Sequence, residues 1–204
     1  NTSEENPDVK LAGKSLTMNG SIDVNFYMDL SETIANDPDT YMEFKTENGR
    51  TSKVQMNQAT KRTIDGSVYY GFSCPVYAKE MTDQVTAQFY ADGQPGKIYT
   101  YSIKQYAQNV LDGKVTCNQE TLNVVKAMLN YGAAAQVQFN YKTDTLANAS
   151  LSDTDKVITD GSFDDYRKSI STNEGIKGIG FYGSSLILTS DTTVRHYFQL
   201  TSGY

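Results

Sequence analysis

The strongest constraint on the fold is an alternation of apolar and polar residues, with a period of two, that recurs through the first half of the chain. In the segment 22–30 the apolar members are Val24, Phe26, Met28 and Leu30. Successive side chains of a β-strand point to opposite faces, so this pattern predicts a strand that is buried on one side. The residues between them should face solvent.

Short pairs of Asn or Asp with Gly separate the alternating segments and mark tight turns. These pairs are Asn19-Gly20, Asn48-Gly49, Asp65-Gly66 and Asp92-Gly93. Such pairs accept the positive φ angles that a hairpin turn requires. The segments and turns together predict an antiparallel β-sandwich of about seven strands over residues 11–102.

After these strands the apolar period changes to that of a helix, so the chain is predicted to be mostly β with some α. Ser102 and Gln105 have the spacing of a capping box, and the short helix that they begin should end at Gly113. A longer helix is expected over residues 118–141, with apolar residues on two faces. We expect this helix to be largely covered and to pack on the sandwich through Leu122, Val125 and Leu129.

An internal repeat links the two ends of the chain. Residues 183–200 align without gaps on residues 13–30, at an offset of 170 residues, and keep the alternation of the first copy. The repeat predicts a lead-in at 1–10, a sandwich and helix module at 11–150, a linker at 151–175 and the first hairpin of a second, truncated module at 176–204. A lone hairpin is marginally stable. We therefore expect it to dock on its own chain, with strand exchange between copies as the alternative.

Several segments resemble a repeat module of secreted and cell-wall-attached, multi-modular surface proteins of gut Firmicutes. The segments that carry the likeness are residues 16–22, 78–83, 101–107 and above all 125–136, VKAMLNYGAAAQ. The likeness covers roughly residues 11–150 and the restarted piece at the end. It implies an extracellular location at the cell surface or cell wall, and it carries no catalytic residues to this chain.

Charge and composition exclude several classes of partner and cofactor. The net charge of −6 and a pI near 4.8 argue against nucleic acid and acidic membrane surfaces. No apolar run reaches the roughly 20 residues of a membrane helix, so no membrane insertion is expected. With two cysteines and one histidine we expect no metal site and no cofactor. The sequence leaves open whether Cys74 and Cys117 form a bridge, and it favours free, buried thiols.

Three constellations could carry chemistry, and each has a simpler structural explanation. His196 with either cysteine could form a nucleophile pair, but it takes the place of Phe26 in the repeat. Paired carboxylates could hydrolyse a polysaccharide, although Asp23 and Asp29 are expected on a solvated strand face. Calcium could bind an acidic stretch of the linker, for which a solvated loop is the simpler explanation. The aspartates of that stretch are Asp153, Asp155 and Asp160.

Outward tyrosines are the candidate ligand-binding residues. Each alternates with apolar neighbours in its strand, and they are Tyr27, Tyr69, Tyr90 and Tyr197. Exposed rings can stack on a sugar or anchor a protein. We therefore expect a non-catalytic surface module that binds an extracellular glycan or a host or bacterial surface protein, or that acts as a spacer. The alternative is an accessory or cryptic hydrolase that uses paired carboxylates.

Overall fold

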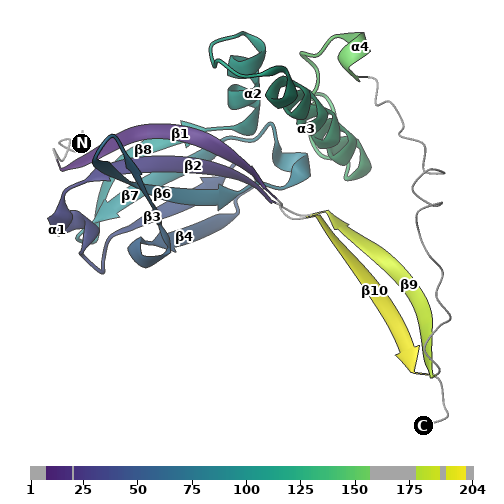
Figure 1. Cartoon of the computed structure of the whole chain (residues 1–204), viewed down its shortest axis with the longest axis horizontal. Coiled ribbons are helices and arrows are strands. Elements are labelled where there is room, and N and C mark those ends of the chain that lie inside the picture. The colour runs from purple at the N-terminus through teal and green to yellow at the C-terminus, as the bar shows by residue number, and fades with distance from the viewer. Residues whose placement is uncertain (1–7, 20, 157–177, 189–191, 201–204) are drawn as a thin grey trace.

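The computed structural model describes residues 8–19, 21–156, 178–188 and 192–200 (Figure 1). Its strands are β1 (Val9–Asn19), β2 (Ser21–Leu30), β3 (Tyr41–Thr46), β4 (Thr51–Gln55), β5 (Thr60–Ile64), β6 (Ser67–Pro75), β7 (Val85–Ala91), β8 (Gln94–Tyr101), β9 (Ile179–Leu188) and β10 (Thr192–Leu200). Its helices are α1 (Glu32–Ala35), η1 (Met56–Gln58), η2 (Ala78–Glu80), α2 (Ile103–Leu111), α3 (Gln119–Gln138) and α4 (Asp153–Lys156). The chain is therefore mostly β with a few helices, as predicted.

Two antiparallel sheets form the body of the molecule, which we call the two-sheet body (β1–β8). The first sheet has the strand order β1-β2-β6-β5 and the second has the order β4-β3-β7-β8. Eight strands therefore lie where about seven were predicted. The additional strand is β5, whose five residues are all exposed and carry no apolar alternation.

The inner faces of the two sheets share one core, and the alternation of β2 is confirmed there. Val24, Phe26 and Met28 are fully buried. Phe26 packs on Phe44 of the other sheet, with ring centroids 5.9 Å apart. An edge-to-face contact between Phe72 and Phe89, at 5.7 Å, joins the same two sheets.

Two of the expected hairpin turns have the predicted backbone. Asp65 and Gly66 have φ angles of 50° and 81°, and Asp92 and Gly93 have φ angles of 48° and 66°. Positive φ at both central residues belongs to the turn whose twist matches that of the flanking strands. These turns join β5 to β6 and β7 to β8.

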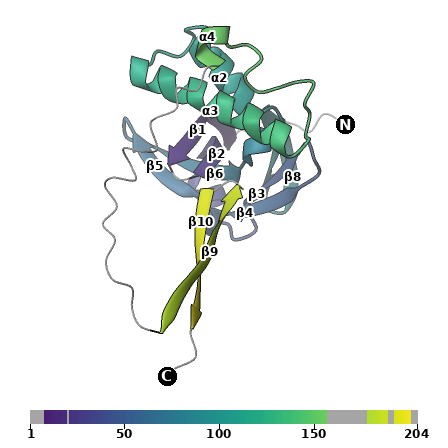
Figure 2. The ribbon, with the colours of Figure 1, turned by 90° about the vertical axis from the view of Figure 1, so that its right-hand side faces the viewer.

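The long helix forms where it was predicted, and two of the three residues expected to pack are buried. Asn118 caps α3 by accepting a hydrogen bond of 2.8 Å from the backbone N–H of Thr121. Val125 and Leu129 are buried as predicted, whereas Leu122 is only half-buried. The main contacts of α3 are with η2 and α2, and α2 and α3 lie together beside the sheets (Figure 2). Val125 and Leu129 belong to the same apolar core as the strand residues.

Gly132 sets how closely α3 approaches η2. A Cβ atom on Gly132 would lie 2.5 Å from Sδ of Met81 and 3.2 Å from Cβ of Ala147. Gly132 therefore allows α3 to approach Met81, next to η2, and Ala147 closely. The residues after α3 also return to it, because Leu151 is buried and Lys126 pairs with Asp155 at 2.8 Å.

The C-terminal hairpin, β9 with β10, extends away from the two-sheet body (Figures 1 and 2). Its apolar side chains are open to solvent: Phe181 is 64% exposed, Phe198 65% and Leu200 78%. The expectation that this hairpin docks on its own chain is therefore wrong. Residues 157–177, which include most of the expected linker, lie outside the described residues.

Candidate functional site

The structure divides the four tyrosines among three surfaces. Tyr27 and Tyr69 share the outer face of the β1-β2-β6-β5 sheet, because each alternates with residues that point into the core. Tyr90 lies on the outer face of the other sheet, and Tyr197 lies on the hairpin. A single platform of all four rings is therefore excluded, and only Tyr27 and Tyr69 can act together.

The ring of Tyr27 lies across its neighbour on β6. Tyr27 is paired with Gly71, and a Cβ atom on Gly71 would lie 2.8 Å from Cε1 of the ring. Only a residue without a side chain leaves this space for the ring. The guanidinium of Arg62 on β5 lies 5.2 Å from the ring centroid, within the range of a cation–π contact.

A row of hydrogen-bonded polar groups lies on the same face beside Tyr27. Asn25, which is 3% exposed, donates from Nδ2 to Ser15 at 3.2 Å and to Thr17 at 2.9 Å. Its Oδ1 accepts a hydrogen bond of 2.6 Å from Ser73. We call this surface the Tyr27 face, and it consists of Ser15, Thr17, Asn25, Tyr27, Arg62, Tyr69, Gly71 and Ser73.

Sequence reasoning found the two tyrosines of this face and missed the other members. Asn25, Arg62 and Gly71 come together only because β6 pairs with both β2 and β5. The alternation does show Asn25 on the polar side of β2. It does not show which strands flank β2.

Tyr90 makes its contacts within its own sheet. Its ring stacks on Tyr41 with centroids 4.6 Å apart, and the ammonium of Lys53 lies 3.3 Å from the centroid of Tyr41. Burial and the negative charge of Glu43 raise the pKa of Tyr90. One face of this ring is therefore already occupied by Tyr41.

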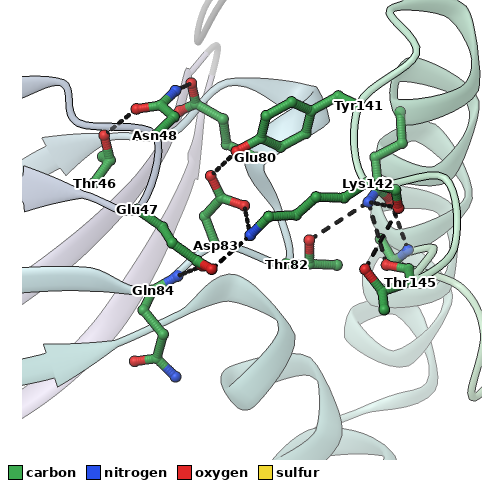
Figure 3. Close-up of polar contacts among 12 residues, drawn as sticks. Thr46, Glu47, Asn48, Glu80, Thr82, Asp83, Gln84, Tyr141, Lys142 and Thr145 are labelled. Carbon is green, nitrogen blue, oxygen red and sulfur yellow. Dashed lines mark hydrogen bonds and ion pairs between the residues drawn. The ribbon is translucent and has the colours of Figure 1, made fainter.

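A second cluster of polar side chains lies where the residues after α3 meet the two-sheet body (Figure 3). Lys142 Nζ lies 2.9 Å from a carboxylate oxygen of Glu47 and 2.9 Å from one of Asp83. Tyr141 donates a hydrogen bond of 2.6 Å to the other oxygen of Asp83, a residue that is 1% exposed. We call Glu47, Asp83, Tyr141 and Lys142 the junction cluster.

Two fully buried polar residues continue this arrangement on either side. Glu80 pairs with Arg50 at 3.1 Å and accepts a hydrogen bond of 2.5 Å from Asn48. Gln136 accepts a hydrogen bond of 2.8 Å from the backbone N–H of Ala147, and its amide donates to the carbonyl oxygens of Lys142 and Thr145. These bonds fix the loops around η2 and after α3, so the cluster joins the helices to the sheets.

The junction cluster brings two carboxylates together, but their environment does not suit glycoside hydrolysis. Hydrogen bonds from Lys142 and from the backbone of Gln84 lower the pKa of Glu47. A general acid needs the opposite shift. The other pair of strand aspartates, Asp23 and Asp29, is six positions apart on β2 and hence about 20 Å apart, well beyond the spacing of a glycosidase pair.

A shallow groove of about 490 Å³ lies between α1 and the η1–β5 region. Asp37 is the one carboxylate among its lining residues. Its oxygens already accept hydrogen bonds from Thr40 and from the backbone N–H groups of Asp39 and Asp92. The groove therefore offers no pair of acid and base.

Comparisons with protein-family models, curated proteins and solved structures found no match for this chain. The function must therefore be inferred from the surfaces described above. No helix in the described ranges is long and apolar enough to cross a membrane.

The remaining chemical candidates are separated in the structure. Cys74 is buried and Cys117 is exposed, both as free thiols, so the expected burial holds only for the first. Burial raises the pKa of Cys74 to about 11, which keeps the thiol protonated at neutral pH. His196 lies 2.7 Å from the hydroxyl of Ser184 on the hairpin.

Within the described part of the chain, no group of three or more metal-ligating side chains could hold an ion. Among the acidic residues considered for calcium, Asp155 is bound by Lys126 and Ser152. Asp160 lies outside the described residues.

The junction cluster should make the protein sensitive to alkaline pH. Burial and the hydrogen bond to Asp83 raise the pKa of Tyr141 from 10.0 to about 12. Since the neutral form is favoured in the folded state, its contribution to stability is complete below pH 10 and is lost as the pH rises through about 12. Urea unfolding between pH 9 and pH 12 should show this fall, and Tyr141→Phe should make it shallower.

Tyr182→Phe is the matched control, because Tyr182 is 79% exposed on the hairpin. Its pH dependence should equal that of the unmodified chain. If Tyr141→Phe leaves the pH dependence as steep as before, the ionisation of Tyr141 is not coupled to folding.

Proposed function

We propose that this chain is a non-catalytic binding module of the β-sandwich kind, displayed outside a bacterial cell, and that its Tyr27 face binds a glycan. The observation that carries the proposal is the position of Tyr27, whose ring lies against Gly71 of the next strand, beside Arg62 and Asn25. On the outer face of the other sheet, by contrast, the ring of Tyr90 is already stacked on Tyr41.

The chemistry of this face suits a sugar. The ring face of an aromatic residue is electron-rich, and it attracts the polarised C–H groups of a pyranose. Hydroxyl groups on either side of the sugar can exchange hydrogen bonds with Ser15, Thr17 and Ser73, which already form a row across three strands. Because the face is a flat sheet surface, an extended oligosaccharide fits it better than a small compact ligand.

The net charge of the chain favours a neutral glycan over an acidic one. At −6 the protein repels a polyanion, and Arg62 is already placed against Tyr27. A module that displays such a face in tandem copies would gain avidity for a polymer. The internal repeat and the resemblance to modules of cell-surface proteins support that setting.

The alternative function, a hydrolase with paired carboxylates, has less support. The carboxylates of Glu47 and Asp83 lie near each other, and Lys142 bridges them. An ammonium between two carboxylates stabilises both in the charged form. We therefore favour binding without catalysis.

A binding experiment with Tyr27→Ala tests the proposal. Neutral oligosaccharides on an array should capture the full chain, and the variant should bind the same glycan at least about 10-fold more weakly, as expected for loss of a central aromatic contact. Gly71→Ala should weaken binding too, because its methyl group would displace the ring. Isothermal titration with the captured oligosaccharide gives the affinities.

Tyr90→Ala is the control, since Tyr90 lies on the opposite sheet and should leave the affinity unchanged. The melting temperature of each variant is measured beside that of the unmodified chain, so that a loss of folding is not mistaken for a loss of binding. Absence of binding to every neutral glycan, or equal binding by Tyr27→Ala and the unmodified chain, would refute the proposed site.

A further inference from the structure

The hairpin at the C-terminal end has the same strand register as the hairpin that begins the two-sheet body. In the first hairpin Leu16 is paired with Val24, and in the second Leu186 is paired with Val194. Each of these residues is 170 positions after its counterpart. The same offset relates the outermost pairs, Val9 with Leu30 and Ile179 with Leu200.

The two hairpins also share an irregularity. The first has a β-bulge between Leu11 and Gly13, and the second has one opposite the step from Tyr197 to Phe198, which places it at Tyr182. Position 182 is again 170 residues after the bulged position 12. A bulge sets the local twist and the direction of side chains, so the two hairpins present equivalent surfaces.

A side-chain bond on the polar face is repeated as well. Ser15 Oγ lies 3.4 Å from the hydroxyl of Tyr27, and Ser185 Oγ lies 3.1 Å from the hydroxyl of Tyr197. The two bonds join corresponding positions, because Ser185 and Tyr197 each lie 170 residues after Ser15 and Tyr27. The second hairpin is therefore a structural copy of the first in its strand register, its bulge and its Ser–Tyr bond.

In the first copy both the free edge and the apolar face are covered. The edge of β2 pairs with β6 from Asp23 to Met28. The apolar face, with Val24, Phe26 and Met28, is fully buried under the second sheet. These contacts show what a hairpin of this shape needs around it.

In the second copy neither contact is present among the described residues. β10 pairs with β9 alone, in a two-stranded sheet. Its apolar face is open, with Val194 at 57% exposure and Phe198 at 65%. An isolated hairpin with an open apolar face is marginal in water, and its unpaired edge is a site for strand addition.

The two-sheet body of a second copy of this chain is a poor partner. To enter it, β9–β10 would have to displace β1–β2, which would then be exposed in turn. His196 would also replace Phe26, a residue that is fully buried against Phe44. Such an exchange buries no additional apolar surface and places a polar ring in the core.

We infer that β9–β10 is the first hairpin of a second module, and that its partner is the remainder of such a module. That partner is a polypeptide equivalent to residues 31–156, with a β6-like strand on the edge of β10 and a β3–β7-like sheet over the apolar face. The shared register, bulge and Ser–Tyr bond carry this inference. It is independent of what the Tyr27 face binds.

The test extends the full chain by a second copy of the elements that follow the first hairpin. Because Tyr204 corresponds to Ile34 at the offset of 170, a second copy of residues 35–156 added after Tyr204 continues the module in register. Hydrogen exchange is measured on both proteins. Amides of 192–200 should exchange about 100-fold more slowly in the extended chain than in the 204-residue chain.

A cross-link tests the register within the extended chain. Val24 is paired with Cys74, so Val194→Cys should form a disulfide with the added copy of Cys74 under mild oxidation. Arg195→Cys is the matched control. It should not form this disulfide, because its counterpart Asn25 is paired with Ser73 and not with Cys74. Cys117 is changed to Ser in both copies and the original Cys74 to Ala, so that the added copy of Cys74 is the one partner thiol.

Two results would overturn the inference. In the first, the hairpin amides exchange equally fast with and without the added residues. In the second, they are already protected in the 204-residue chain in proportion to its concentration, which would make another copy of the chain the partner.

Discussion

Lys142→Met is expected to lower the free energy of unfolding by about 1–3 kcal/mol at pH 7, because the lysine is half-buried and its loss leaves a buried carboxylate without its cationic partner. Asp83 is 1% exposed, and Lys142 is its cationic partner at 2.9 Å. Methionine keeps most of the length of the lysine stem, so the packing changes little. The variant would leave the Asp83 carboxylate buried with the hydroxyl of Tyr141 and no ammonium.

Urea unfolding of the variant and of the unmodified chain at pH 7 measures the loss.

Lys114→Met is the control, because the Lys114–Asp112 pair lies on the surface, with the lysine side chain 65% exposed. Exposed pairs contribute about 0–1 kcal/mol. Equal losses in the two variants would show that the junction cluster is no more than a surface ion pair.

Local patterns were sufficient to predict most of the strands and both longer helices. The period-two alternation of β2 depends only on which residues of one strand face the core, and the structure buries Val24, Phe26 and Met28 as expected. The caps Ser102 and Asn118 also act within one helical turn. Such features are determined by neighbouring residues, so they can be read without knowledge of the fold.

The arrangement of these elements could not be read in the same way. Strand order decides that Arg62 on β5 and Gly71 on β6 meet Tyr27 on β2, and no pattern within a strand encodes its neighbours. The junction cluster has the same origin, since Glu47, Asp83 and Lys142 come from three separate loops. β5 was missed because all of its side chains are exposed, which removes the alternation that marks a strand.

The position of α3 shows that a correctly predicted helix can have main neighbours that its sequence does not identify. The apolar residues of α3 predicted a covered helix. They did not show whether the sheets or the neighbouring helices would cover it. The structure places η2 and α2 against it, with Gly132 in close contact with Met81. Periodicity identifies the buried side of a helix, but it does not identify the element that buries it.

Leu129→Ala is expected to cost about 2–5 kcal/mol of the free energy of unfolding. Leu129 is 1% exposed on the buried side of α3, so the shorter side chain removes apolar contacts and leaves a cavity beside η2 and α2. A loss in this range, measured by urea or thermal unfolding, would show that the helical layer belongs to the same cooperative unit as the sheets. The range reflects how far the neighbouring side chains can move into the space.

Val137→Ala separates this packing effect from any effect on the helix itself. Val137 lies on the same helix and is 61% exposed, so its truncation should change stability by less than about 0.5 kcal/mol. Alanine is also the better helix former, which makes a small gain as acceptable as a small loss. If both substitutions were equally mild, α3 would not be packed at Leu129. Equally large losses would mean instead that the outer face of α3 is covered in solution, and only a large loss at Leu129 with none at Val137 agrees with the structure.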